Sequence, residues 1–113
     1  MKHELRDAIR KLCKRYPDKY WQSLDRERAY PEKVVGELAD AGFLACMIPE
    51  EFGGPGLGIR EAAVILEEIN RSGGNGAACH AQMYTMGTLL RHGSEEQKRH
   101  WLPGIASGET RLQ

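Results

Sequence analysis

The sequence is poor in cysteine and has no excess of charge of either sign. Its three cysteines stand far apart, without a Cys-x-x-Cys pair, which argues against a disulfide framework and against a zinc site. No two of its four histidines lie at the i, i+4 spacing of a zinc-binding helix, so no metal site is predicted. Sixteen basic and sixteen acidic side chains cancel, and without a basic field we expect no nucleic acid partner.

The chain also lacks a long hydrophobic run. Residues 72–90 contain no Lys, Arg, Asp or Glu, but glycines and polar side chains interrupt them, so the apolar part is well short of the ~20 residues of a membrane span. The first residues are charged and carry no apolar signal segment, from which we expect a cytoplasmic protein. At 113 residues, the chain is expected to form a single domain, residues 1–113.

No stretch alternates polar and apolar residues with the period that strands require, whereas the helical period of about 3.6 residues recurs along the chain. The apolar stripes and the breaks between them predict five helices, at residues 5–16, 31–41, 59–71, 77–91 and 94–102. The predicted fold class is therefore all-α: an up-and-down, bundle-like domain of about five helices.

Four details follow from this pattern. Residues 17–30 are expected to form a connection. In the third helix, Glu68 is placed on the solvent-facing side. The fourth helix has apolar residues around most of its circumference, so we expect the other helices to surround it. The fifth begins with SEEQ at residues 94–97, which is typical of a capping box, and is expected to end before Pro103.

The stretch from residue 49 to residue 58, PEEFGGPGLG, is the most glycine-rich part of the chain. It must turn tightly, and Gly53, Gly54, Gly56 and Gly58 are free to take positive φ. A phosphate-binding loop would follow a buried strand and carry a lysine, and this stretch has no lysine. We therefore predict a shaped connection between two helices, with a loop near a cofactor or a domain contact as the alternative.

Two stretches resemble the acyl-CoA dehydrogenase family: IPEEFGGPGL at residues 48–57 and GSEEQKRHWLPGIASGE at residues 93–109. Both occur in this order, separated by two predicted helices, and the resemblance covers nearly the whole chain. It implies the N-terminal helical domain of a longer flavoenzyme, with a middle β-domain and a C-terminal helical domain absent from residues 1–113.

The resemblance also implies a chemistry. In the family a glutamate removes the α-proton of an acyl-CoA thioester, and the β-hydrogen leaves as a hydride to FAD. The base and most flavin contacts belong to the domains absent here, so no catalytic residue is assigned in this chain. The implied partners are an acyl-CoA substrate and, in the complete enzyme, an electron-transfer flavoprotein and further copies in a homo-oligomer.

What the helical domain contributes, by resemblance, is one wall of the acyl pocket. Matching the family backwards from Gly93 places four residues on the pocket side of the fourth helix, at spacings that share one face: Ala77, His80, Ala81 and Tyr84. Of these, we expect His80 and Tyr84 to determine the length or shape of the acyl group. A histidine departs from the apolar or amide lining of enzymes for straight chains, and favours a polar, branched or aromatic acyl group.

Two alternatives stay open. The helices could form a stand-alone module that binds a partner helix or a second copy through exposed apolar surface. The chain could equally belong to a related flavin oxidase or monooxygenase, because the same architecture serves several reactions.

Overall fold

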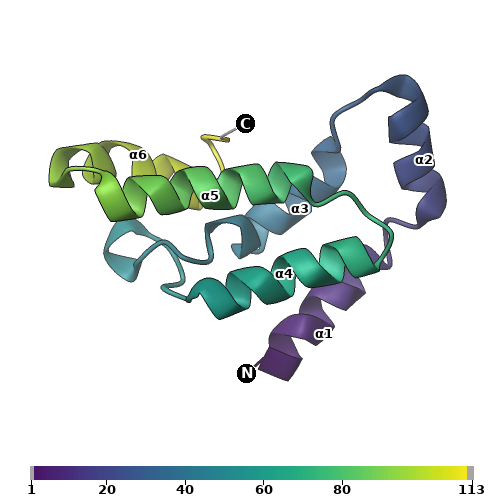
Figure 1. Ribbon diagram of the computed structural model, residues 1–113, viewed down its shortest axis with the longest axis horizontal. Coiled ribbons are helices and arrows are strands. Elements are labelled where there is room, and N and C mark those ends of the chain that lie inside the picture. Colours follow the sequence, from purple (N-terminus) through teal and green to yellow (C-terminus); the bar gives the residue numbers. More distant parts are fainter. Residues whose placement is uncertain (1, 112–113) are drawn as a thin grey trace.

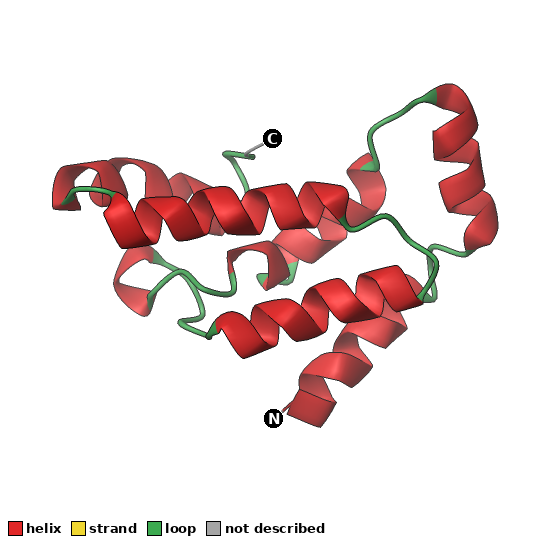
Figure 2. Cartoon of the chain, in the orientation of Figure 1, coloured by secondary structure: helices red, strands yellow, loops and turns green. Residues whose placement is uncertain are grey.

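The computed structural model describes residues 2–111, and every regular element within that range is a helix (Figure 1, Figure 2). The all-α prediction is confirmed. In chain order the elements are α1 (Lys2–Cys13), α2 (Asp18–Glu27), α3 (Glu32–Asp40), the short 3-10 helices η1 (Phe43–Ala45) and η2 (Glu50–Phe52), α4 (Ile59–Arg71), α5 (Ala77–His92) and α6 (Glu95–Ser107).

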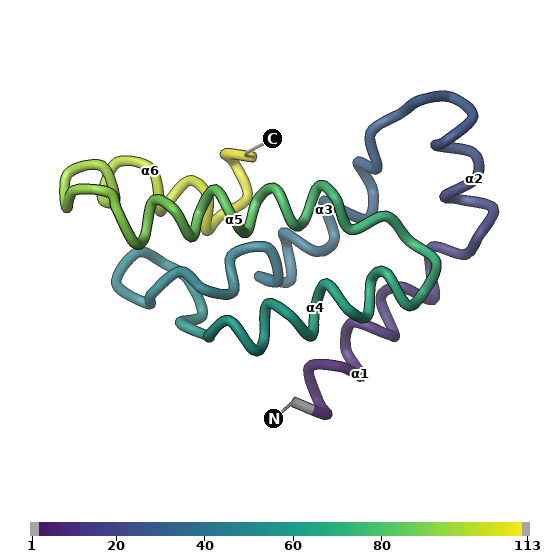
Figure 3. Tube along the Cα trace, viewed as in Figure 1, coloured from purple at the N-terminus to yellow at the C-terminus, as the bar shows by residue number. Residues whose placement is uncertain are grey.

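The domain is flat, with extents of 43 × 33 × 19 Å. The tube in Figure 3 shows α4 and α5 running antiparallel beside one another, joined by a short loop. Helix α1 packs along α4, whereas α6 packs on α5 and on the two 3-10 helices. Helix α3 leads into η1, which contacts both α5 and α6 and so joins the two halves.

The buried side chains form two clusters that follow this division. One cluster joins α1, α3, α4 and the first half of α5, and includes Ile9, Leu38, Ile65 and Met83. The other joins the 3-10 helices to α6 and the second half of α5, and includes Ile48, Phe52, Met86, Leu102 and Ile105. Burying such aliphatic side chains stabilises the fold by roughly 1.5–3 kcal/mol each.

Helix α2 was not predicted, because residues 17–30 were expected to form a connection. Its ten residues include none that is fully buried, and only Tyr20, Trp21 and Leu24 are half-buried. The Trp21 ring lies so close to Gly74 that a Cβ there would be 2.8 Å from the indole. Helix α2 is therefore held by one aromatic patch. Because only three of its residues are half-buried, its apolar stripe is short and gives a weak periodic signal.

The glycine-rich loop is the shaped connection that the sequence predicted. Of the four glycines that are free to take positive φ, Gly53 and Gly56 adopt it, whereas Gly54 and Gly58 do not. Gly54 is required for a different reason: a Cβ built there would lie 2.2 Å from the carbonyl oxygen of Ile48. The same oxygen accepts a hydrogen bond from the Gly56 N–H at 2.8 Å, so the chain folds back on itself here.

Helix α6 begins as predicted and ends later than predicted. The Ser94 hydroxyl accepts a hydrogen bond from the Gln97 N–H, and the Gln97 side chain accepts one from the Ser94 N–H, which forms the expected capping box. Pro103 does not end the helix, which continues to Ser107 and stops at Gly108 in the left-handed conformation. Burial of Leu102 and Ile105 on either side of the proline offsets its missing hydrogen bond.

Glu68 is buried, contrary to its predicted place on the solvent side of α4. Its side chain is 1% exposed and lies between α1 and α4, where it pairs with Arg10 at 2.7 Å and with Arg6 at 3.0 Å. Hydrogen bonds from Arg10, and then from Arg6, lower the pKa of Glu68 and outweigh the opposing effect of burial. The carboxylate is therefore held charged in the packed seam between the two helices.

Candidate functional site: the outward face of α5

Helix α5 buries one face and exposes the other. Its buried face carries Cys79, Gln82, Met83 and Met86. Ala77, His80, Tyr84 and Thr88 are exposed on the opposite face, and Ala81 beside them is half-buried. The expectation that other helices surround α5 was therefore wrong, because small and weakly polar side chains cover this face without requiring a packed neighbour. We call the exposed set, residues 77, 80, 81, 84 and 88, the outward face.

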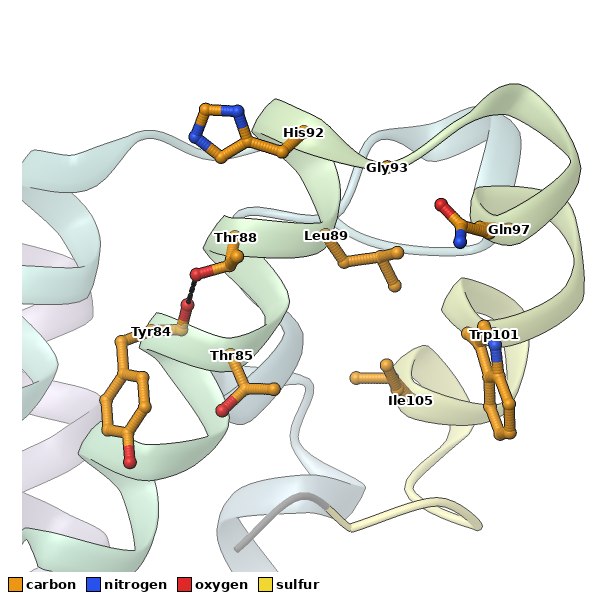
Figure 4. Close-up of a pocket in the computed structure, with 9 residues that line it drawn as sticks. All are labelled: Tyr84, Thr85, Thr88, Leu89, His92, Gly93, Gln97, Trp101 and Ile105. Carbon is orange, nitrogen blue, oxygen red and sulfur yellow. Dashed lines mark hydrogen bonds between the residues drawn. The ribbon is translucent and has the colours of Figure 1, made fainter.

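A hollow of about 550 Å³ lies between α5 and α6 (Figure 4). Leu89 of α5 and Ile105 of α6 point into the space between the helices, and the Trp101 indole lies at its α6 side. Tyr84 and Thr88 border the hollow from the outward face, where the Thr88 hydroxyl donates to the Tyr84 carbonyl at 2.8 Å. The walls are therefore mostly apolar, with a few hydroxyl groups.

A second hollow, of about 480 Å³, lies on the other side of the outward face, between α4 and α5. Its floor contains Ala62 and Met83, and its rim carries His80, Tyr84 and Arg91. The rings of His80 and Tyr84 contact edge to face, with centroids 5.2 Å apart and planes at 66°. Tyr84, Thr88 and His92 line both this hollow and the first, so they lie between the two.

A third hollow, of about 440 Å³, lies at the beginning of α5. Ala77, Ala78 and Ala81 form its α5 wall, and the segment between α2 and α3 forms the opposite wall with Arg28 and Tyr30. Three alanines on one wall leave room for a ligand group, because none has a side chain larger than a methyl group.

The structure brings the four predicted pocket residues onto one face but divides them between hollows. Ala77 and Ala81 line the third hollow, whereas His80 and Tyr84 line the second. All four lie on the outward face of α5, as their spacing of three, four and seven predicts. Their binding to an acyl group stays a prediction.

Sequence reasoning missed two groups of residues that border the same face. Gln97, Trp101 and Ile105 line the first hollow from α6, and their i, i+4, i+8 spacing is the signal that would have found them. Trp101 is 49% exposed, which is unusual for so large an apolar side chain. Arg28 lies outside any predicted helix, and no periodic pattern marks it.

The three thiols are excluded as nucleophiles by their surroundings. All three cysteines are buried and free. Burial raises the pKa of Cys46 to about 11 and that of Cys79 to about 12, so neither is a thiolate at neutral pH. Burial also raises the pKa of Cys13. They pack as small apolar side chains.

The hollows do not fit a complete flavin nucleotide. A pyrophosphate needs several converging N–H donors or arginines, and the hollow in Figure 4 is lined by no lysine or arginine. Within residues 2–111 the second hollow offers only Arg91 and the third only Arg28 as a cation. We therefore assign no FAD contact to these three hollows and derive no step through the flavin.

The fold and this one-sided helix define a class: a helical domain that presents an open, uncharged face. Residues 1–109 match the family model described as "Acyl-CoA dehydrogenase, N-terminal domain". The chain belongs to the acyl-CoA dehydrogenase family, as its N-terminal domain, and the resemblance found in its two motifs is confirmed.

Relatives of known name agree with this assignment. The probable acyl-CoA dehydrogenase FadE25 of Mycobacterium tuberculosis is 35% identical over 106 residues, which cover 92% of this chain and 27% of the relative. The mitochondrial short-chain specific acyl-CoA dehydrogenase of Mus musculus is 31% identical over 113 residues, covering 94% of this chain and 27% of the relative. The chain thus spans about a quarter of the length of these relatives.

Solved structures share the fold. A variant of the Tcur3481-Tcur3483 steroid ACAD matches 96% of this chain and 29% of its own with a TM-score of 0.62 and 30% identity. A chain from the structure described as "Electron transferring flavoprotein of Acidaminococcus fermentans" covers 97% of this chain, and 30% of that chain is matched, with a TM-score of 0.81 at 21% identity. At that identity the second likeness shows the fold alone.

Proposed function

We propose that this domain forms one wall of the acyl pocket in an FAD-dependent acyl-CoA dehydrogenase, which oxidises a thioester between its α and β carbons. The outward face of α5 carries this proposal. It is a helix face free of charge from residue 77 to residue 90, exposed along its length and bordered by three hollows. Such a face suits an apolar ligand and a covering domain better than it suits water.

The four residues of the predicted pocket wall would have two different roles. Ala77 and Ala81 leave space for the acyl group, whereas His80 and Tyr84 limit its shape from the neighbouring hollow. The edge contact between these two rings fixes a rigid, partly polar border. A polar, branched or ring-bearing acyl group matches that border better than a long unbranched chain, whose carbons cannot pair with the imidazole nitrogens.

The remaining parts of the enzyme would lie in a β-domain and a second helical domain beyond residues 1–113. They would bind FAD and supply the glutamate base, since we assign neither to this chain. In the complete enzyme, an electron-transfer flavoprotein would accept the electrons, and copies would associate in a homo-oligomer. None of the helices in residues 2–111 is long and apolar enough to cross a membrane. We place the enzyme in the cytoplasm, where it would act in fatty acid metabolism.

The complete gene product that carries residues 1–113 provides the test. We expect it to purify with visible flavin absorption, and we expect an acyl-CoA thioester added without oxygen to bleach that absorption. A colourless protein that leaves every acyl-CoA unoxidised would overturn the proposal. If the reduced flavin reacts faster with oxygen than with an electron-transfer flavoprotein, the enzyme is a related oxidase or monooxygenase.

The proposed pocket wall is tested by a substitution that reduces the space in the third hollow. Ala81→Leu fills the third hollow, so kcat/KM for a bulky acyl-CoA should fall about tenfold or more, the scale of a lost apolar fit. Ala8→Leu makes the same change at an exposed position of α1 and should leave kcat/KM unchanged. Equal behaviour of the two variants would contradict a pocket at Ala81.

A second candidate function is a stand-alone interaction module. It is favoured by the three exposed large apolar residues, Ile59 at 73%, Tyr84 at 57% and Trp101 at 49%, which line the two adjoining hollows beside α5. Sedimentation of the 113-residue chain tests it. A dimer that the pair Tyr84→Ala and Trp101→Ala dissociates would support the module, whereas a monomer at all concentrations would exclude self-association.

A further inference from the structure

We propose that Arg28 binds a carboxylate at the far end of the acyl group, so that the substrates are CoA thioesters of dicarboxylic acids. This inference rests on the proposed function and adds the substrate class to it. It starts from the third hollow, where Arg28 faces Ala77 and Ala81 across a space of about 440 Å³.

Arg28 borders two adjoining hollows. The neighbouring one, of about 380 Å³, is lined by Trp21, Asp25 and the loop that contains Gly74. It shares four residues with the third hollow: Arg28, Ala29, Pro31 and Asn75. Asp25 is the only acidic residue that lines either, and it lines only the neighbouring one. In the third hollow, the Arg28 guanidinium is the only charged group.

The guanidinium of Arg28 forms no ion pair within residues 2–111. It shares this with Arg26, Arg60, Arg91 and Arg99. The other five arginines each pair with a carboxylate at 3.7 Å or closer: Arg6, Arg10, Arg15, Arg71 and Arg111. Arg28 therefore keeps all its N–H donors available, in the fork geometry that matches a carboxylate.

The backbone of Arg28 adopts a conformation that is unusual for a residue with a long side chain. Arg28 has φ 55° and ψ 41°, the only positive φ at a residue other than glycine within 2–111. It ends α2, with its N–H directed to the carbonyls of Asp25 and Leu24. Glycine is the usual residue at such a helix end, and a long side chain there carries a conformational cost.

The walls favour the end of an acyl group over a phosphate of CoA. Alanines 77, 78 and 81, Tyr30 and Pro31 make the third hollow largely apolar, with Arg28 as its one cation. Phosphates are held by several converging donors or charges, whereas an open, largely apolar hollow with one exposed arginine on its wall suits a carbon chain terminated by a carboxylate. An acyl group lying along the outward face from Tyr84 would end in this hollow.

The experiment compares two CoA thioethers of equal chain length, S-(ω-carboxyalkyl)-CoA and S-alkyl-CoA, which cannot be oxidised. Their dissociation constants are measured on the complete gene product by calorimetry. We expect the carboxylate to tighten binding about tenfold, the scale of one charge-assisted hydrogen-bonded pair. Arg28→Gln should remove that advantage and leave the S-alkyl affinity unchanged.

Two further variants separate binding from folding. Arg28→Gly relieves the left-handed backbone, so its melting temperature should equal or exceed that of the wild type while the preference for the carboxylate is lost. Arg26→Gln, a neighbouring arginine of α2 that lines neither hollow, should keep the preference.

The outcomes distinguish this inference from the proposed function. Equal binding of both thioethers by the wild type would overturn the carboxylate site even if acyl-CoA bleaches the flavin. If Arg28→Gln weakens the binding of both thioethers equally, the arginine contacts the phosphates of CoA, and the carboxylate site is also overturned. A preference that depends on Arg28, in a protein that oxidises no thioester, would uphold the site and remove the dehydrogenase function.

Discussion

Two regions of the molecule differ in the burial and pairing of their polar side chains: the seam between α1 and α4, and the outward face of α5. In the seam, the Glu68 carboxylate is buried and meets Arg6 and Arg10 at hydrogen-bonding distance. On the outward face, the His80 ring touches only Tyr84 among the interactions that the structure describes. The seam is a finished interface, in which charge is buried because it is paired. The outward face leaves its rings and hydroxyl groups exposed, which is the feature on which the proposed contact with a ligand or a covering domain rests.

Removing buried aliphatic volume beside the seam should have the largest effect. Ile65→Ala in α4 leaves a cavity beside α1, and we expect a loss of about 2–5 kcal/mol in the free energy of unfolding. Ile59→Ala, the same change in the same helix at a position that is 73% exposed, should change it by less than about 0.5 kcal/mol. Denaturant unfolding of the two variants measures this, and similar losses would contradict the assignment of Ile65 to the core.

The buried carboxylate gives a smaller effect. Glu68→Gln keeps the side-chain volume and removes the charge that Arg6 and Arg10 meet, which should lower the free energy of unfolding by about 1–3 kcal/mol. Glu67→Gln next to it changes a side chain that is 62% exposed and should have little effect. If both variants unfold at the same denaturant concentration as the wild type, the seam does not depend on its charges.

The same carboxylate predicts a pH dependence. Because the pKa of Glu68 in the folded protein lies below its ordinary value near 4.5, its stabilisation is complete above that pH and is lost as the pH falls through the lowered value. Below about pH 4.5, the wild type should therefore lose stability more steeply than Glu68→Gln. Denaturant unfolding at successive pH values measures the two slopes. Glu37, whose pKa is lowered chiefly by Arg15, should give a parallel difference in Glu37→Gln.

The smallest effect is expected on the outward face. Tyr84→Ala removes a ring that is 57% exposed, so the free energy of unfolding should change by less than about 0.5 kcal/mol. Met83→Ala, one residue earlier and 3% exposed, should cost about 2–5 kcal/mol. A large loss in Tyr84→Ala would mean that the ring stabilises the domain itself and is not reserved for a ligand or a covering domain.

The sequence predicts the helices best where an apolar stripe is long. The ranges of α3, α4 and α5 follow from such stripes, and the capping box at Ser94 marks the start of α6. Helix α2 was missed because it is held by its own aromatic residues, of which Trp21 packs against Gly74 of a neighbouring loop, and periodicity does not register such contacts. The prediction that α6 ends before Pro103 was wrong because burial of the side chains on either side of the proline outweighed its local preference.

The candidate site was predicted only in part, for a related reason. Spacing placed Ala77, His80, Ala81 and Tyr84 on one face, but it gave no sign of which face of α5 the fold leaves open. Glu68 shows the limit clearly: a glutamate among charged neighbours reads as solvent-facing until two arginines from a distant helix are brought to it. Arg28 lies in the connection between α2 and α3, and the chain there has no periodic sequence pattern that would predict its place beside α5.

The contact between Gly54 and the Ile48 carbonyl reaches beyond the loop that contains it. Because η2 packs on α6, a shift of this turn would reach α6, whose Trp101 lines the first hollow together with Leu89 of α5. A single added methyl group at residue 54 would be transmitted to that space through the backbone. The shape of the first hollow can therefore be altered from a position that does not line it.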